Sequence, residues 1–195
     1  MTIWLVRHAQ PLVETGICYG VTDIRADDAA THTAARALAL ELPRGAHVIT
    51  SPLQRCEHLT LILRGLRPDL TCNTDVRLSE MNFGRWEGQR WDAIDRHELA
   101  AWTGAFETWR CGGGESVQDV MERVTCAWGD AQATQQPTAW ITHAGVIRAA
   151  TLIAHGVRRV TQASRWPLHA PGFGEWWMQG NAGAWAKSSM ADQKR

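Results

Sequence analysis

Short apolar runs alternate with longer segments of helical periodicity along the chain. The runs at residues 2–6 (TIWLV), 46–50 (AHVIT) and 138–142 (TAWIT) each precede a segment with apolar residues at helical spacing. Strands that alternate with helices indicate parallel pairing, because a parallel crossover needs a connection of about helix length. The predicted fold class is therefore α/β, with a mostly parallel central sheet.

Capping residues mark where three of the helices should start. The predicted N-caps are Asp27 or Asp28, then Ser51 with Pro52 at the first helical position, then Ser116 with Asp119 in a capping box. Shorter strands are predicted at residues 70–74 and 174–180, and a last helix from residue 144 to Gly156. We expect one domain over residues 1–186, followed by a polar tail at 187–195.

Composition limits the classes of partner. The chain has 20 basic and 20 acidic residues, so no net charge draws it to nucleic acid or to an anionic membrane. It has neither a secretory leader nor an apolar run near the ~20 residues of a membrane span. Five scattered cysteines without a C-x-x-C pair indicate a reduced compartment, and we expect a cytoplasmic protein. The oligomeric state is left open, a homodimer included.

Polar residues follow three of the predicted strands. Arg7 and His8 end the first, Arg55 lies in the first turn of the helix after the second, and His143 ends the strand at 138–142. In an open α/β sheet the ligand crevice lies beyond the carboxyl ends of the strands, where helix N-termini add partial positive charge. Two arginines and two histidines there suit a doubly charged anion with several oxygens, and a phosphate monoester fits best.

An imidazole beside that phosphate suggests chemistry beyond binding. His8 could attack phosphorus through a ring nitrogen, and Glu80, in the segment LSEMNFGRWEG, is the candidate acid for the leaving oxygen. Each residue alone has an ordinary structural explanation. Glu87 in the same segment is expected only to support the loop.

Four segments in order, LVRHAQP, SPLQRC, LSEMNFGRWEG and ITHAGVIR, resemble the signature segments of the histidine phosphatase superfamily, the phosphoglycerate mutase-like fold. The resemblance implies a three-layer α/β/α sandwich that needs no metal or other cofactor. It also implies that His8 is the phosphorylated nucleophile and Glu80 the proton donor and acceptor. Arg7, Arg55 and His143 would hold the phosphoryl group.

Two further segments, GICYGVTD and GGGES, resemble the alpha-ribazole phosphatase branch, which removes a 5'-phosphate during cobalamin nucleotide-loop assembly. Gln10, Tyr19 and Gly20 are then candidate substrate contacts. Ala9 departs from the family by replacing the usual glycine after the nucleophile. Three functions stay open at this point: a phosphomonoesterase for a small molecule, a mutase or broad-specificity phosphatase for sugar phosphates or nucleotides, and a non-catalytic phosphate-binding protein.

Overall fold

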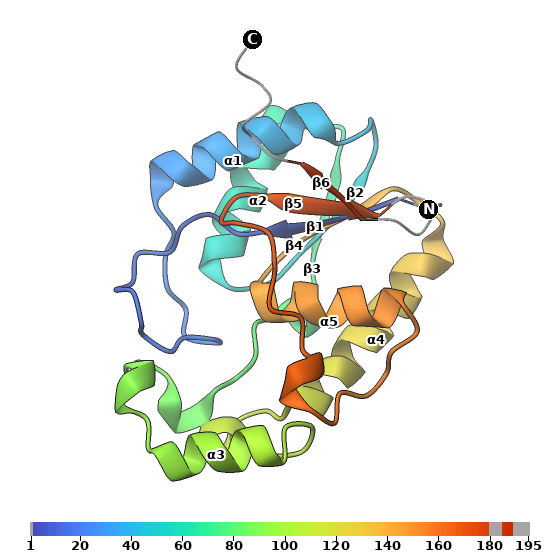
Figure 1. Ribbon diagram of the computed structural model, residues 1–195. Coiled ribbons are helices and arrows are strands. Elements are labelled where there is room, and N and C mark those ends of the chain that lie inside the picture. Colours follow the sequence, from blue (N-terminus) through green and yellow to red (C-terminus); the bar gives the residue numbers. More distant parts are fainter. Residues whose placement is uncertain (1, 180–184, 189–195) are drawn as a thin grey trace.

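A six-stranded sheet forms the centre of the computed structural model, which describes residues 2–179 and 185–188 (Figure 1). The strand order is β3-β2-β4-β1-β5-β6. The strands are β1 (Ile3–Arg7), β2 (His47–Thr50), β3 (Thr71–Thr74), β4 (Thr138–Thr142), β5 (Trp176–Gln179) and β6 (Trp185–Ser188). β3, β2, β4 and β1 pair in parallel, whereas β5 is antiparallel to both of its neighbours. The predicted mostly parallel sheet is confirmed.

Helices cover both faces of this sheet, which gives the predicted three layers (Figure 1). α1 (Asp28–Glu41) and α2 (Gln54–Leu66) pack together on one face, and α4 (Val117–Thr134) and α5 (Ala144–Ala154) on the other. Each face has its own apolar cluster, because alternate residues of β1 point to opposite sides. Ile3 and Leu5 enter the cluster under α4 and α5, while Trp4 and Val6 enter the one under α1 and α2.

The segment between β3 and α4 forms a separate lobe at the bottom of Figure 1. The lobe contains α3 (Arg96–Gly104) and the short 3-10 turns η2 (Gly84–Trp86), η3 (Trp91–Ala93) and η4 (Cys111–Gly113), whereas η1 (Val76–Leu78), at the start of the segment, packs on α4 and β4. Its tryptophans pack on one another, with Trp86 in ring contact with Trp91, Trp102 and Trp109. Another 3-10 turn, η5 (Ala163–Arg165), follows α5.

Two of the three predicted helix starts are confirmed. The Asp27 side chain accepts the N–H of Ala30 at the start of α1, and Ser116 and Asp119 form the capping box of α4. The predicted cap at Ser51 is wrong.

α2 begins three residues later, at Gln54, whose N–H is accepted by Asp23 from the loop after β1 (2.8 Å). The Ser51 hydroxyl accepts the N–H of Leu53 (3.3 Å) and is also bonded to His143 (2.8 Å), and the chain bends at residues 52 and 53 before the helix begins.

The predicted end of the last helix and the predicted start of the polar tail also differ from the structure. α5 ends at Ala154 instead of Gly156. β6 was not predicted, and it takes in residues 187 and 188 of the expected polar tail. Residues 189–195 lie outside the described residues.

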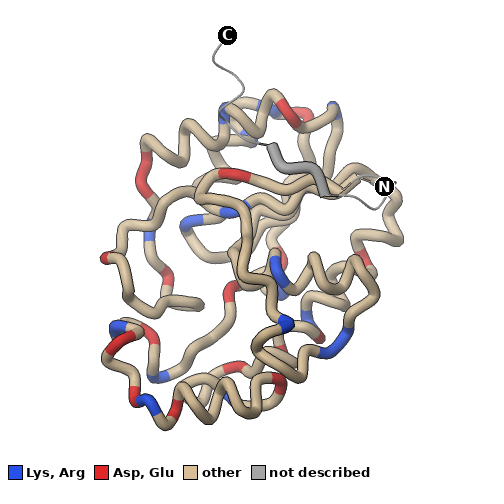
Figure 2. Tube along the Cα trace, viewed as in Figure 1, with Lys and Arg blue, Asp and Glu red and all other residues tan. Residues whose placement is uncertain are grey.

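Charge is distributed evenly over the fold. Blue and red segments are interspersed along the tube in Figure 2, as the equal numbers of basic and acidic residues lead one to expect. Within residues 2–179 and 185–188, no helix has the length and apolar content that crossing a membrane would require.

Candidate active site

The carboxyl ends of three adjacent strands bring the predicted site residues together. β2, β4 and β1 lie side by side in that order, and their ends lead into Ser51, His143 and His8. Backbone hydrogen bonds fix the register of these strand ends. The His8 N–H donates to Thr142 O (3.0 Å), and the Ser51 N–H donates to Ile141 O (3.0 Å). In Figure 1 this edge faces the blue loop that follows β1.

His8 is buried at the end of β1 as a neutral imidazole. Its Nδ1 lies 2.7 Å from the carbonyl oxygen of Ala9, so Nδ1 carries the proton and the lone pair belongs to Nε2. Burial lowers the pKa of His8 to about 3, with further contributions from the positive charges of Arg55 and then Arg7. The ring is therefore unprotonated at neutral pH.

Arg55 is fully buried beside it and is held by the loop at residues 20–22. Its guanidinium donates to the carbonyl oxygens of Gly20 (2.5 Å) and Thr22 (2.9 Å), and its Nε–H to Nδ1 of His143 (3.3 Å). Because Nδ1 of His143 accepts, its Nε2–H donates to the Ser51 hydroxyl (2.8 Å). Burial holds the pKa of His143 well below its usual value, and the two histidine rings lie 5.2 Å apart.

Arg7 approaches from β1 and rests on the segment that leads into β5. Its guanidinium carbon lies 3.7 Å from the centre of the Phe173 ring, and its NH1 donates to Pro171 O (3.1 Å). Tyr19 interacts with the same guanidinium from the other loop, and its ring centre is 5.5 Å from the guanidinium carbon of Arg55. Burial lowers the pKa of Arg7.

Three arginines around this point lack a carboxylate partner. Among the described residues, Arg7, Arg55 and Arg148 form no salt bridge, whereas Arg67, Arg77 and Arg123 elsewhere are each paired with a carboxylate. Buried charges in proteins are normally paired. The three line one cavity of about 230 Å³ together with His8, Tyr19, Glu80 and His143. The site is thus built to receive an anion.

Glu80 faces this cavity from the loop after η1. One carboxylate oxygen accepts the N–H of Met81 and the other that of Gly145 in the first turn of α5 (3.0 Å each). A Cβ at residue 145 would stand 2.3 Å from the nearer oxygen, so glycine is needed for this approach. The helix N-terminus and the two N–H groups hold Glu80 in place.

Glu87 binds the loop that holds Arg55. It accepts the backbone N–H groups of Gly20, Val21 and Thr22 at 2.9–3.0 Å, and that of Phe83 at 3.0 Å. Burial alone would raise the pKa of Glu87, but the hydrogen bonds from Thr22 and the backbone outweigh it and lower the pKa. Its expected role as loop support agrees with these contacts.

The sequence profile of the histidine phosphatase superfamily (branch 1) matches residues 3–172, which include every residue that lines the cavity. The chain belongs to this superfamily. Phosphatase chemistry on small phosphate monoesters is the activity that this membership supports. The comparison with curated proteins found no match.

Solved structures of similar fold include mycobacterial glucosyl-3-phosphoglycerate phosphatase. Its complex with VO3 is 24% identical with a TM-score of 0.76, covering 96% of both chains. Its complex with inorganic phosphate is 22% identical with the same TM-score, covering 96% of this chain and 95% of that one. A protein from Thermus thermophilus is 26% identical with a TM-score of 0.66, covering 91% and 92%. The phosphoglycerate mutase-like fold predicted for the chain is confirmed, whereas membership in the alpha-ribazole branch is not shown.

The remaining predicted site residues, Gln10, Tyr19 and Gly20, differ in where they lie relative to the cavity. Tyr19 lines the cavity. Gln10 is exposed and is not among the residues that line it. Gly20 does not line the cavity, but its carbonyl oxygen accepts a hydrogen bond from Arg55. The backbone there packs so closely on Met81 that a Cβ would come within 1.8 Å of Met81 O. Ala9 is buried, and its carbonyl oxygen sets the tautomer of His8.

Sequence reasoning missed Arg148, Asp23 and Phe173 as neighbours of the site. Arg148 stands at the end of the quoted segment ITHAGVIR, three residues after Gly145, so helical spacing could have placed it on the same face of α5. Asp23 ends the quoted segment GICYGVTD, but it and Phe173 lie in loops, where no periodicity indicated their positions. Among the described residues, no group of three or more His, Cys, Asp or Glu could hold a metal ion.

The low pKa of His8 predicts that the folded protein loses stability in mild acid. The unfolded chain takes up a proton near the ordinary histidine pKa, about 6.5, whereas the folded protein does so only near 3. Unfolding free energy therefore falls as pH falls from about 6.5, by up to roughly 1.4 kcal/mol per pH unit for each such histidine. Urea titrations at several pH values give the free energy of unfolding at each pH. Plotted against pH, this free energy should rise less steeply for His8→Asn than for wild type. An unchanged slope would show that His8 is not neutral in the fold.

Proposed function

We propose that the protein is a phosphomonoesterase that works through a phosphohistidine intermediate on His8. The observation that carries this proposal is the neutral imidazole of His8 beside three arginines without carboxylate partners, Arg7, Arg55 and Arg148. Among the described residues nothing hydrogen-bonds its Nε2. A phosphate dianion supplies the missing negative charge, and arginine binds its oxygens in pairs.

In the first step His8 Nε2 attacks phosphorus while the bond from phosphorus to the ester oxygen breaks. Glu80, protonated at this stage, gives its proton to the departing oxygen, and an alcohol leaves. Arg7 and Arg55 stabilise the charge on the remaining phosphoryl oxygens, which is the main demand of phosphoryl transfer. The Ala9 carbonyl keeps the lone pair on the attacking nitrogen.

In the second step a water molecule attacks the phosphohistidine. Glu80, now a carboxylate, takes the proton of that water, and the bond between phosphorus and Nε2 breaks. Inorganic phosphate leaves and the site returns to its starting state. His143 is proposed to hold the phosphoryl group as well. Both of its ring nitrogens are bonded to Arg55 and Ser51, so we assign it first the positioning of Arg55.

For the substrate we keep alpha-ribazole 5'-phosphate as the first candidate, supported by the segments GICYGVTD and GGGES. A mutase or broad-specificity phosphatase for sugar phosphates or nucleotides is the alternative, and a non-catalytic phosphate-binding protein is the alternative of another class. We place the activity in the cytoplasm, in keeping with five free cysteines.

A substrate panel tests this proposal. It compares kcat/KM for alpha-ribazole 5'-phosphate, sugar phosphates, nucleotides, phosphoglycerates and glucosyl-3-phosphoglycerate. Phosphate release from at least one monoester is the expected result. Absence of turnover with all of them, alongside phosphate binding, would favour the non-catalytic alternative.

We predict that this activity does not depend on a metal, because the proposed mechanism draws its positive charge from arginines and its nucleophile from His8. Phosphate release should proceed at the same rate, within error, before and after dialysis against excess chelator. Loss of activity with chelator and its return with a divalent ion would contradict the mechanism.

A further inference from the structure

A second cavity, of about 330 Å³, adjoins the proposed phosphate site. The two cavities share four lining residues, Glu80, Phe83, Trp91 and Arg148. The proposed proton donor therefore stands where one cavity opens into the other. An ester oxygen placed at Glu80, with its phosphorus at His8, puts the rest of the substrate beside the second cavity. A third cavity, of about 340 Å³, also reaches Glu80, but it shares no other lining residue with the phosphate site.

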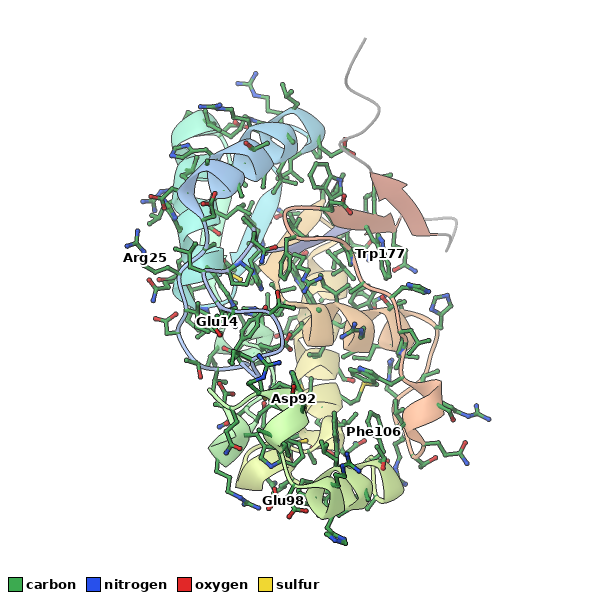
Figure 3. All side chains as sticks on the ribbon, turned by 60° about the vertical axis from the view of Figure 1, so that its left-hand side comes forward. Glu14, Arg25, Asp92, Glu98, Phe106 and Trp177 are labelled. Carbon is green, nitrogen blue, oxygen red and sulfur yellow. The ribbon has the colours of Figure 1, made fainter. Side chains whose placement is uncertain are left out.

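The wall of this second cavity is a run of aromatic rings. Phe83 contacts Trp91 edge-on (5.4 Å between ring centres), Trp91 stacks on Trp102 (6.3 Å), and Trp102 stacks on Phe106 (5.6 Å). Phe106 then meets Trp166 at 6.1 Å, which joins the segment after α3 to the one after η5. Figure 3 shows Phe106 between α3 and the orange segment that carries η5.

Charged groups enter this cavity only at its junction with the phosphate site. Of its lining side chains, Glu80 and Arg148 are the two that ionise, and the others are apolar, aromatic or glycine. Arg148 donates to Leu168 O (3.1 Å) and so ties down the segment that carries Trp166. Many hydroxyl groups of a sugar-like leaving group would find no partner in this cavity, whereas a flat ring would pack against the aromatic side chains that line it.

We propose that the leaving group of the substrate carries a flat aromatic or heteroaromatic ring, which binds in the cavity formed by Phe83, Trp91, Trp102, Phe106 and Trp166. This inference rests on the proposed phosphatase function and narrows its substrate class. The size of the cavity suits a ring system of one or two rings, near the lower end of typical ligand pockets. Trp166 is a specificity residue in this account and takes no part in the bond-breaking step.

The test compares two alkyl phosphates, 2-(naphthalen-1-yl)ethyl phosphate and ethyl phosphate. Both release a primary alkoxide, so they demand the same acid catalysis and differ in the ring. Wild-type protein should prefer the naphthyl ester in kcat/KM by on the order of 10²-fold. Trp166→Ala should reduce this preference about tenfold while leaving kcat/KM for ethyl phosphate within about twofold, and Trp166→Phe should restore most of it.

Trp109→Ala is the matched control. Trp109 contacts Trp86 in the same lobe, but it does not line the cavity, so the naphthyl preference should persist in this variant.

A second readout, the Kd of the non-hydrolysable 2-(naphthalen-1-yl)ethylphosphonate, needs no turnover. Tight binding that weakens in Trp166→Ala, without phosphatase activity on any ester, would support the aromatic site and overturn only the proposed function. Turnover with equal kcat/KM for the two esters, or a preference for glucosyl-3-phosphoglycerate over the naphthyl ester, would overturn the aromatic site and leave the phosphatase standing.

Discussion

The His8→Ala protein is expected to fold and to hydrolyse phosphate monoesters more than about 10⁴-fold more slowly than wild type, because no other group replaces the lost nucleophile. His8 lies at the end of β1, where its backbone N–H, which alanine keeps, makes the sheet contact to Thr142. Circular dichroism checks the fold, and phosphate release under saturating substrate gives kcat.

His32→Ala is the control for this prediction. His32 is an exposed residue of α1 on the far side of the sheet from Glu80, and its loss should leave kcat unchanged. If folded His8→Ala kept activity within tenfold of wild type, His8 could not be the nucleophile.

Glu80→Gln should show the second-largest effect, and its size should depend on the leaving group. General acid catalysis contributes about 10²–10⁴-fold, so kcat/KM for an alkyl phosphate should fall by that amount. For nitrophenyl phosphate the loss should stay under about tenfold, because the phenolate leaves without a proton. The comparison uses kcat/KM because this constant reports only the steps up to departure of the alcohol. Hydrolysis of the phosphohistidine comes later and does not affect it.

Glu87→Gln is the matched variant for Glu80→Gln. Glu87 binds the backbone of residues 20–22, whose carbonyls hold Arg55, so its loss should lower kcat/KM for both esters by the same factor. Equal losses on the two esters in Glu80→Gln, or a loss that depends on the leaving group only in Glu87→Gln, would show that the proton comes from the other carboxylate.

The sheet and the convergence of the site could be predicted because both follow from local patterns. Apolar runs that alternate with helical segments indicate a parallel sheet, and in such a sheet Arg7, His8 and His143 must meet at one edge. The capping box at Ser116 is equally local, since both partners lie within one turn.

The remaining features depend on contacts between segments distant in sequence. Ser51 has the side chain of an N-cap, but its hydroxyl is bonded to His143, 92 residues later, and α2 receives its cap from Asp23. The low pKa of His8 likewise depends on the folded surroundings of this side chain. Burial dominates, and Arg55 contributes more than Arg7. Neither the burial of His8 nor the position of Arg55 can be read from the residues next to His8 in the sequence.

The covalent intermediate is the most direct test of the proposed mechanism. Glu80→Gln mixed with nitrophenyl phosphate should form phosphohistidine readily and hydrolyse it slowly, because the base for water is missing. A rapid quench in alkaline denaturant, followed by mass spectrometry of the peptides, should find close to one phosphate per chain on His8, matched by a burst of nitrophenol of the same size. Phosphate on a different residue, or steady turnover with neither burst nor phosphorylated His8, would contradict the mechanism.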